Sequence, residues 1–140
     1  MSRATPDGTP LPLHPEGWAP GTGYAHGMVA TGRLVVTAGQ IGWDPVTCKI
    51  VSDDFAEQAA QTLRNVVAVL RAGGAGPEHL VRLTWYVTTR DEYVASRRTL
   101  GAAYREIVGA HYPAMAVVMV SALVEPRAKV EIEATAVVPQ

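Results

Sequence analysis

The chain has 140 residues, of which 12 are basic and 13 acidic, and 48% are hydrophobic. This length suits one domain with its own core, and a net charge of −1 gives no electrostatic reason to expect a nucleic-acid or acidic-membrane partner. Charged residues make up only 18% of the chain, against roughly 25% in typical soluble domains. This apolar surplus predicts a surface that is buried against another subunit.

Cysteine use and hydropathy bear on the compartment. The single cysteine, Cys48, excludes an internal disulfide and a multi-cysteine zinc site. The first 20 residues lack the apolar segment of a signal peptide, and the longest apolar run, residues 114–124, is too short to cross a bilayer. We therefore expect a cytoplasmic protein.

The first 22 residues are rich in proline and glycine, which predicts an irregular N-terminal arm followed by a single domain at 23–140. Residues 24–31 and 34–38 read as two short strands joined by a hairpin turn at 31–33. Residues 39–47 read as a loop, because Asp44-Pro45 is a turn dipeptide.

The first helix has clear signals at both ends. Asp54 with Glu57 three residues later resembles a capping box. Gly73-Gly74 should end the helix, since glycine readily takes a left-handed conformation. Between these signals, apolar residues recur at helical spacing: Phe55, Ala59, Leu63, Val66 and Leu70.

The next two elements are a strand at 80–88 and a helix that begins at Asp91. In the strand, Leu83, Trp85 and Val87 share one face. The helix should end before Gly109 and Pro113. Its apolar stripe consists of Tyr93, Leu100, Tyr104 and Ile107.

Two further strands complete the pattern. Residues 116–120 are apolar on both faces, which predicts a central, buried strand. Residues 129–138 alternate, with Val130, Ile132, Ala134 and Ala136 facing inward. The order ββαβαββ predicts an α/β sandwich with the helices on one face of a mixed sheet.

Common catalytic motifs are missing. The sequence contains no phosphate-binding loop, no dinucleotide-binding glycine motif and no serine nucleophile elbow. The four histidines show no metal-ligand spacing, and Cys48 reads as a bystander in a turn. We therefore predict neither a metal nor a cofactor.

Five short strings follow one another along residues 23–138. They are Gly23-Tyr24, Thr37-Ala38-Gly39-Gln40-Ile41, the helical run 57–66 with Gln58, Gln61 and Asn65, Tyr112-Pro113-Ala114, and Val130-Glu131-Ile132-Glu133-Ala134. In this order and spacing they resemble the RidA/YjgF family, the reactive-intermediate deaminases. The resemblance implies a chorismate-mutase-like fold assembled as a homotrimer with ligand clefts between subunits. It also implies hydrolysis of 2-imino acids or their enamine tautomers to 2-oxo acids and ammonia, without metal or cofactor.

The resemblance implies roles for individual residues. The early tyrosine of the family falls on Tyr24 and the glutamate of its last strand on Glu131; both would position or protonate the reacting species. Gly39 and Gln40 match the turn beside the cleft, and Ala38 stands where the family has a serine.

Three positions depart from the family. The arginine that anchors the substrate carboxylate reads Met115, a frequent cysteine reads Val117, and an asparagine of the second helix aligns with Arg98. Hydrogen bonds to charged groups contribute roughly 1.5–3 kcal/mol each, and an arginine fork makes two. We therefore expect weak binding of 2-imino acids. A more apolar cleft near Trp43 and Trp85, lined passively by Met115, would take a ligand that is bulkier or lacks a carboxylate.

Each candidate also has a structural interpretation. Glu131 can act as a general acid/base or, with Glu133, simply cover the exposed face of a strand. Tyr24 can donate to a ligand or be a half-buried aromatic, and Trp43 can shape the pocket or belong to the core. Arg98 is a candidate replacement anchor or part of a solvated helix face, and Arg127 is a second candidate anchor.

Two classes of function remain open. The first is a cofactor-independent hydrolase of deaminase type for an imine, enamine or related C–N substrate, in which Glu131 handles protons while Tyr24 or the Gly39–Gln40 backbone polarises the leaving group. The alternative is a non-catalytic trimeric ligand-binding module, which needs the cleft but not the chemistry. Ribonuclease activity, proposed for relatives within the family, is disfavoured by the net charge of −1 and the lack of a basic aromatic patch.

Overall fold

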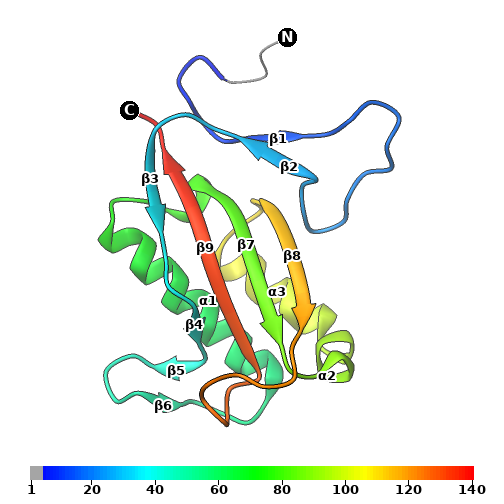
Figure 1. Ribbon diagram of the computed structural model, residues 1–140, viewed down its shortest axis with the longest axis vertical. Helices are drawn as coiled ribbons and strands as arrows, with labels where there is room; N and C mark the ends of the chain where they lie inside the picture. Colours follow the sequence, from blue (N-terminus) through cyan, green and yellow to red (C-terminus); the bar gives the residue numbers. More distant parts are fainter. Residues whose placement is uncertain (1–4) are drawn as a thin grey trace.

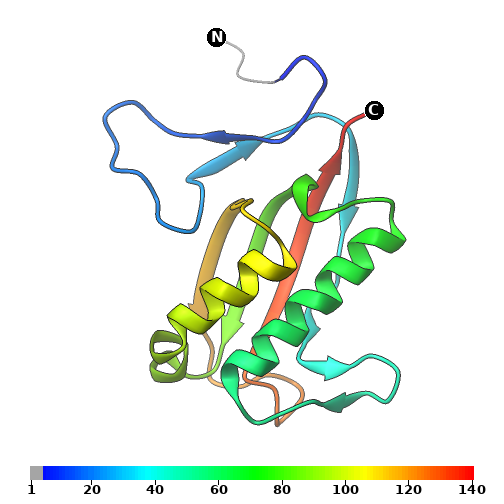
Figure 2. The ribbon, with the colours of Figure 1, turned by 180° about the vertical axis from the view of Figure 1, so that it is seen from behind.

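The computed structural model describes residues 5–140. One mixed sheet organises the fold, with helices on one side of it only (Figures 1 and 2). Its strands follow the order β3 (Arg33–Val36), β9 (Val130–Val138), β7 (Leu80–Val87) and β8 (Ala114–Met119), and β4 (Gln40–Ile41) also pairs with β9. The central pair, β7 and β9, is antiparallel, whereas β7 and β8 are parallel. The predicted α/β class with a mixed sheet is confirmed.

Helix α1 (Phe55–Ala72) begins and ends where the sequence predicts. The Asp54 carboxylate accepts a hydrogen bond of 2.9 Å from the Glu57 backbone N–H, as an N-cap should. At the other end Gly74 has φ = 78°, and the Ala75 N–H donates to the Leu70 carbonyl at 2.9 Å. A left-handed residue of this kind closes a helix by turning the chain back onto its last carbonyls.

The predicted second helix is two helices. α2 (Arg90–Ala95) and α3 (Arg97–Ile107) meet at Ser96, whose φ of −95° and ψ of 0° interrupt the helix. A short 3₁₀ turn, η1 (Pro77–His79), leads into β7. The predicted stripe still faces inward, since Leu100 and Tyr104 are buried.

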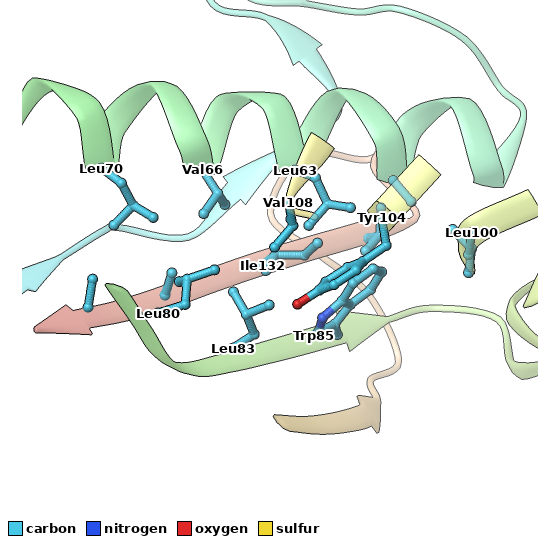
Figure 3. Close-up of a cluster of buried hydrophobic side chains, with 14 of the residues drawn as sticks. Leu63, Val66, Leu70, Leu80, Leu83, Trp85, Leu100, Tyr104, Val108 and Ile132 are labelled. Atoms are coloured by element: carbon cyan, nitrogen blue, oxygen red, sulfur yellow. The ribbon is translucent and has the colours of Figure 1, made fainter. Parts of the chain in front are cut away.

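The hydrophobic core lies between the helices and the sheet, as Figure 3 shows. Both central strands place alternate residues in it, which confirms the predicted inward positions on β7 and β9. Its labelled members are Leu63, Val66, Leu70, Leu80, Leu83, Trp85, Leu100, Tyr104, Val108 and Ile132. Among the described residues, no helix is long and apolar enough to cross a membrane.

The N-terminal part differs from the prediction. The arm contains a strand, β1 (Leu11–Leu13), that pairs with β2 (Gly27–Val29). Proline is tolerated in β1 because this strand has a neighbouring strand on one side only, so that a residue without a backbone N–H breaks no sheet hydrogen bond on the other side. The predicted hairpin at 31–33 is wrong: β3 pairs with β9 rather than with β2. Gly32, at φ = 154°, turns the chain close to the Val138 carbonyl, where no side chain fits.

Two other predictions are wrong in part. The predicted loop at 39–47 contains β4 and β5 (Trp43–Asp44). β5 forms a small hairpin with β6 (Lys49–Ile50), which follows the predicted loop, and the Asp44 carboxylate holds the turn of this hairpin. Residues 116–120 do not form a central strand, because β8 lies at the edge of the sheet. Within one chain Val118 is 40% and Met119 44% exposed. Packing within one chain therefore does not explain why β8 carries apolar side chains on both faces.

Tyr104 predicts an alkaline loss of stability. Its hydroxyl donates to the His111 carbonyl at 2.6 Å, and burial, followed by the nearby Tyr112, raises the pKa of Tyr104 above its ordinary value of 10. Because the folded chain holds this proton more tightly than the unfolded chain, the contribution is complete below about pH 10 and is lost as the pH rises further. Urea unfolding at increasing pH should show this fall, and Tyr104→Phe should remove it. Tyr93→Phe is the control and should still show the fall. If the stability of Tyr104→Phe fell equally with pH, a group other than Tyr104 would be responsible for the loss.

Candidate functional site

Gly39 and Glu131 lie against each other on the helix-free face of the sheet. β4 pairs with the start of β9, so that Ile41 is opposite Glu131 and Gln40 is opposite Ile132. A Cβ atom on Gly39 would collide with the Glu131 carboxylate. The Gln40 amide donates to the Ala38 carbonyl at 3.2 Å. Four candidate residues therefore lie close together where β4 pairs with β9: Ala38, Gly39, Gln40 and Glu131.

A second carboxylate on this face is already engaged. The Tyr86 hydroxyl donates to Glu133 Oε1 at 2.8 Å, and this bond raises the pKa of Tyr86. Tyr86 is opposite Glu131 in the β7–β9 register. Of the two glutamates, Glu133 is held by a neighbouring strand, whereas Glu131 faces the Gly39 backbone.

Tyr24 lies beside the start of β8. The next residue, Ala25, bridges to Ala114, and its N–H donates to the Pro113 carbonyl at 3.1 Å. Tyr24 lines a cavity of about 360 Å³ between the N-terminal segment and residues 110–112, a volume typical of small-molecule sites. Its ring meets the His26 ring edge-on, with centroids 5.5 Å apart. The cavity is lined by uncharged and histidine side chains only.

The Tyr24 and Glu131 positions are far apart within one chain. Ala114 is opposite Arg82, whereas Glu131 is opposite Tyr86, four residues further along β7, which is about 13 Å. β8 and β9 flank β7 on opposite sides, which adds about 10 Å across the strands. In Figure 1 β2 and β4 mark these opposite ends of the sheet. One chain therefore cannot apply both residues to one small substrate.

The two candidates on β8 face the helices. Met115 is opposite Leu83 and Val117 is opposite Trp85, and Met115 packs against the core. The Trp85 ring is itself buried in the core (Figure 3). The expectation that Trp85 borders the cleft is therefore wrong: as an inward residue of a central strand, Trp85 is covered by α3.

The remaining candidates have different surroundings. Trp43 is half-buried, and its carbonyl accepts a bond of 2.9 Å from the Asn65 amide. Arg98 is exposed on α3. Arg127 forms an ion pair of 2.8 Å with Asp53, and this contact lowers the pKa of the Asp53 carboxyl. Arg127 is thus already paired.

Two buried amides on α1, Gln58 and Asn65, received no role from the sequence. Both lie in or beside the apolar stripe of the helix and are buried. A polar residue within such a stripe is a readable signal, because a buried amide requires partners. Residues 5–140 contain no group of three or more His, Cys, Asp or Glu side chains that could hold a metal ion.

Comparisons with known proteins show which family the chain resembles. Residues 16–138 match the family model described as Endoribonuclease L-PSP. The chain is 40% identical to Protein DfrA of Myxococcus xanthus over 79% of this chain and 80% of DfrA. It is 37% identical to the 2-iminobutanoate/2-iminopropanoate deaminase of Salmonella typhimurium, over 81% and 86% of the two chains.

A solved structure of similar shape extends the match to the whole fold. The Rid-family protein YyfB of Yersinia pestis, described as being of unknown function, superposes with a TM-score of 0.80 at 33% identity, covering 93% of this chain and 99% of that one. The family model, the sequence identities and the shared fold together show that the chain belongs to the RidA/YjgF family.

Proposed function

We propose that the protein is a cofactor-independent hydrolase of the deaminase type, acting on an imine, enamine or related C–N substrate. The observation that carries this proposal is the Glu131 carboxylate against the Gly39 backbone, on a sheet face free of helices. The reaction class is supported by the Salmonella relative, which is named as a deaminase of 2-iminobutanoate and 2-iminopropanoate.

The chemistry requires one base that later acts as an acid. Water adds to the imine carbon while Glu131 accepts its proton, and the same carboxyl returns the proton to the nitrogen. Glu131 then passes the hydroxyl proton of the carbinolamine to the amino nitrogen, so that the C=O bond forms as the C–N bond breaks and ammonia leaves. The backbone at Gly39–Gln40, where Gly39 has no side chain of its own, or the Tyr24 phenol polarises the leaving nitrogen.

Tyr24 and Glu131 meet on one substrate only if they come from different copies of the chain. The large separation within one chain supports this part of the proposal. So do the exposed apolar side chains of the helix-free face, where Leu34 is 64% and Val36 60% exposed. Apolar patches of this kind mark interaction surfaces, and we propose a homotrimer with its clefts between subunits.

The oligomer is tested by light scattering after size exclusion. We expect a mass of three times the 14.9-kDa chain. Val36→Glu should yield monomers without activity, because it places a charge on the covered face. Val46→Glu, at an 89% exposed turn position, is the matched control and should remain a trimer. A wild-type monomer with full activity would contradict the shared cleft.

The reaction is tested on a panel of imines generated in solution, with ammonia release as the measurement. Half of the panel should carry a carboxylate next to the C=N bond and half should lack one. The proposal expects acceleration of at least one imine over the uncatalysed rate. Ligands that raise the melting temperature without any turnover would instead favour a non-catalytic binding module. The observation that motivates this alternative is that Ala38 and Met115 stand where the family has a serine and an arginine.

A further inference from the structure

Helix α1 carries two buried primary amides, and each uses three hydrogen-bonding positions. Gln58 Nε2 donates to the Ser52 carbonyl at 2.8 Å and to the Arg127 carbonyl at 3.0 Å, while Oε1 accepts from the Lys129 N–H at 2.9 Å. Asn65 Nδ2 donates to the carbonyls of Ile41 and Trp43, and Oδ1 accepts from Gln61. Seven residues apart, the two amides lie on the same side of the helix.

Four partners of these amides lie at the end of β4, at the start of β5 or just before β9, next to the contact that forms the candidate site. Gln58 holds Arg127 and Lys129, and β9 begins at the next residue, with Glu131 as its second member. Asn65 holds both ends of the β4–β5 turn, from Ile41 to Trp43. Ile41 is in turn the residue that pairs with Glu131. One helix therefore fixes both sides of the contact between Gly39 and Glu131.

The β4–β5 turn touches the helix directly at Gln58. A Cβ atom on Gly42 would lie 2.6 Å from the Gln58 carbonyl oxygen and 2.7 Å from its Cα atom. Backbone therefore meets backbone at this point, and the turn has no freedom to shift toward the helix. The Asn65 amide, bonded to the carbonyls of Ile41 and Trp43, opposes the opposite movement, away from α1.

We propose that Gln58 and Asn65 are positioning residues for Glu131: through the β4–β5 turn and the start of β9 they hold the Glu131 carboxylate against the Gly39 backbone. The inference rests on the proposed function for its link to catalysis. If the amides only satisfied buried backbone groups, their replacement would leave the rate per folded molecule unchanged.

The test compares Gln58→Met and Asn65→Leu with Thr62→Val. Thr62 is buried on the same helix, but its hydroxyl donates to the Gln58 carbonyl within the helix and holds neither strand. Positioning predicts that Gln58→Met and Asn65→Leu lower kcat about 100-fold, as an ångström-scale misplacement can, with little change in KM. Thr62→Val should keep its kcat. Equal rates per folded molecule in all three variants would overturn the proposal.

A milder variant covers the case in which the amide variants do not fold. From a half-buried position, Gln61→Leu removes the bond of 2.9 Å that orients the Asn65 amide, together with a long, exposed bond of 3.5 Å from Arg64. It should fold and show a smaller loss of kcat in the same direction. An unchanged kcat in Gln61→Leu, with Asn65→Leu unfolded, would count against a positioning role for Asn65.

A readout without substrate separates this inference from the proposed function. The NMR signals of the Gly39 amide and of the Glu131 side-chain carboxyl should move in Gln58→Met and Asn65→Leu but not in Thr62→Val. If the wild-type protein hydrolyses no imine while these signals move as expected, the proposed function fails and the positioning stands. If imines are hydrolysed and the signals do not move, the positioning fails alone.

Discussion

Glu131→Gln should lower kcat/KM for imine hydrolysis by about 10²–10⁴-fold, the range that a single general acid/base contributes. The amide keeps the size of the side chain and its place against Gly39, but it can neither accept the proton of the attacking water nor return it to nitrogen. The loss should fall mainly on kcat, because the proposed role is in the chemical step rather than in binding. Initial rates of ammonia release on the most rapidly hydrolysed imine measure it.

The matched control is Glu133→Gln. Glu133 lies on the same face of β9, two residues from Glu131, and accepts the Tyr86 hydrogen bond. Removing its charge changes the electrostatics of the sheet face by the same amount without touching the Gly39 contact, so most of the rate should remain. If both variants lost the same fraction of the rate, a general effect of negative charge would replace the specific role of Glu131. Full activity in Glu131→Gln would remove Glu131 from the mechanism.

The elements that the sequence predicts correctly are those with local signals. The Asp54 cap, the left-handed Gly74 and the stripe between them lie within twenty residues of one another, and α1 follows them. The alternation in β9 also holds, because the core buries every second residue of that strand. Apart from the break between α2 and α3 at Ser96, the errors concern strands and their pairing. Whether β3 pairs with β2 or with β9 depends on residues about a hundred positions away. In β8, apolar side chains on both faces indicate that both faces are buried, but they do not show whether the same chain or another chain covers the second face.

The same limit applies to the site. No spacing rule connects Gly39 with Glu131, 92 positions later; only the family resemblance named both, and the pairing of β4 with β9 brings them together. The resemblance could not show that Tyr24 lies at the other end of the sheet, since that follows from the β7 register. The buried amides of α1 were visible as polar residues near an apolar stripe, yet their partners at 41, 43, 127 and 129 become apparent only in the fold.

Among the imines, 2-iminopropanoate should be hydrolysed at close to the background rate, whereas an imine without a carboxylate should be hydrolysed faster. The position of the family's anchoring arginine is Met115, half-buried against the core, and the cavity beside Tyr24 has no Arg or Lys in its lining. A carboxylate that leaves water without a charged partner loses more than it gains. Competition between the two imines in one reaction, followed by their carbonyl products, measures the preference directly.

Met115→Arg should reverse this preference, raising kcat/KM for 2-iminopropanoate by about 10–100-fold, because hydrogen bonds to a carboxylate are worth roughly 1.5–3 kcal/mol each. The stem of the new side chain can follow the path of Met115 while its guanidinium reaches water, one residue from Ala114 and its bridge to the Tyr24 segment. Met115→Gln, polar but uncharged, is the control for altered packing and should show no gain. A wild-type protein that already hydrolyses 2-iminopropanoate as fast as the uncharged imine would mean that another group binds the carboxylate, and a loss of that activity in Arg98→Ala would identify the exposed Arg98 of α3 as that group.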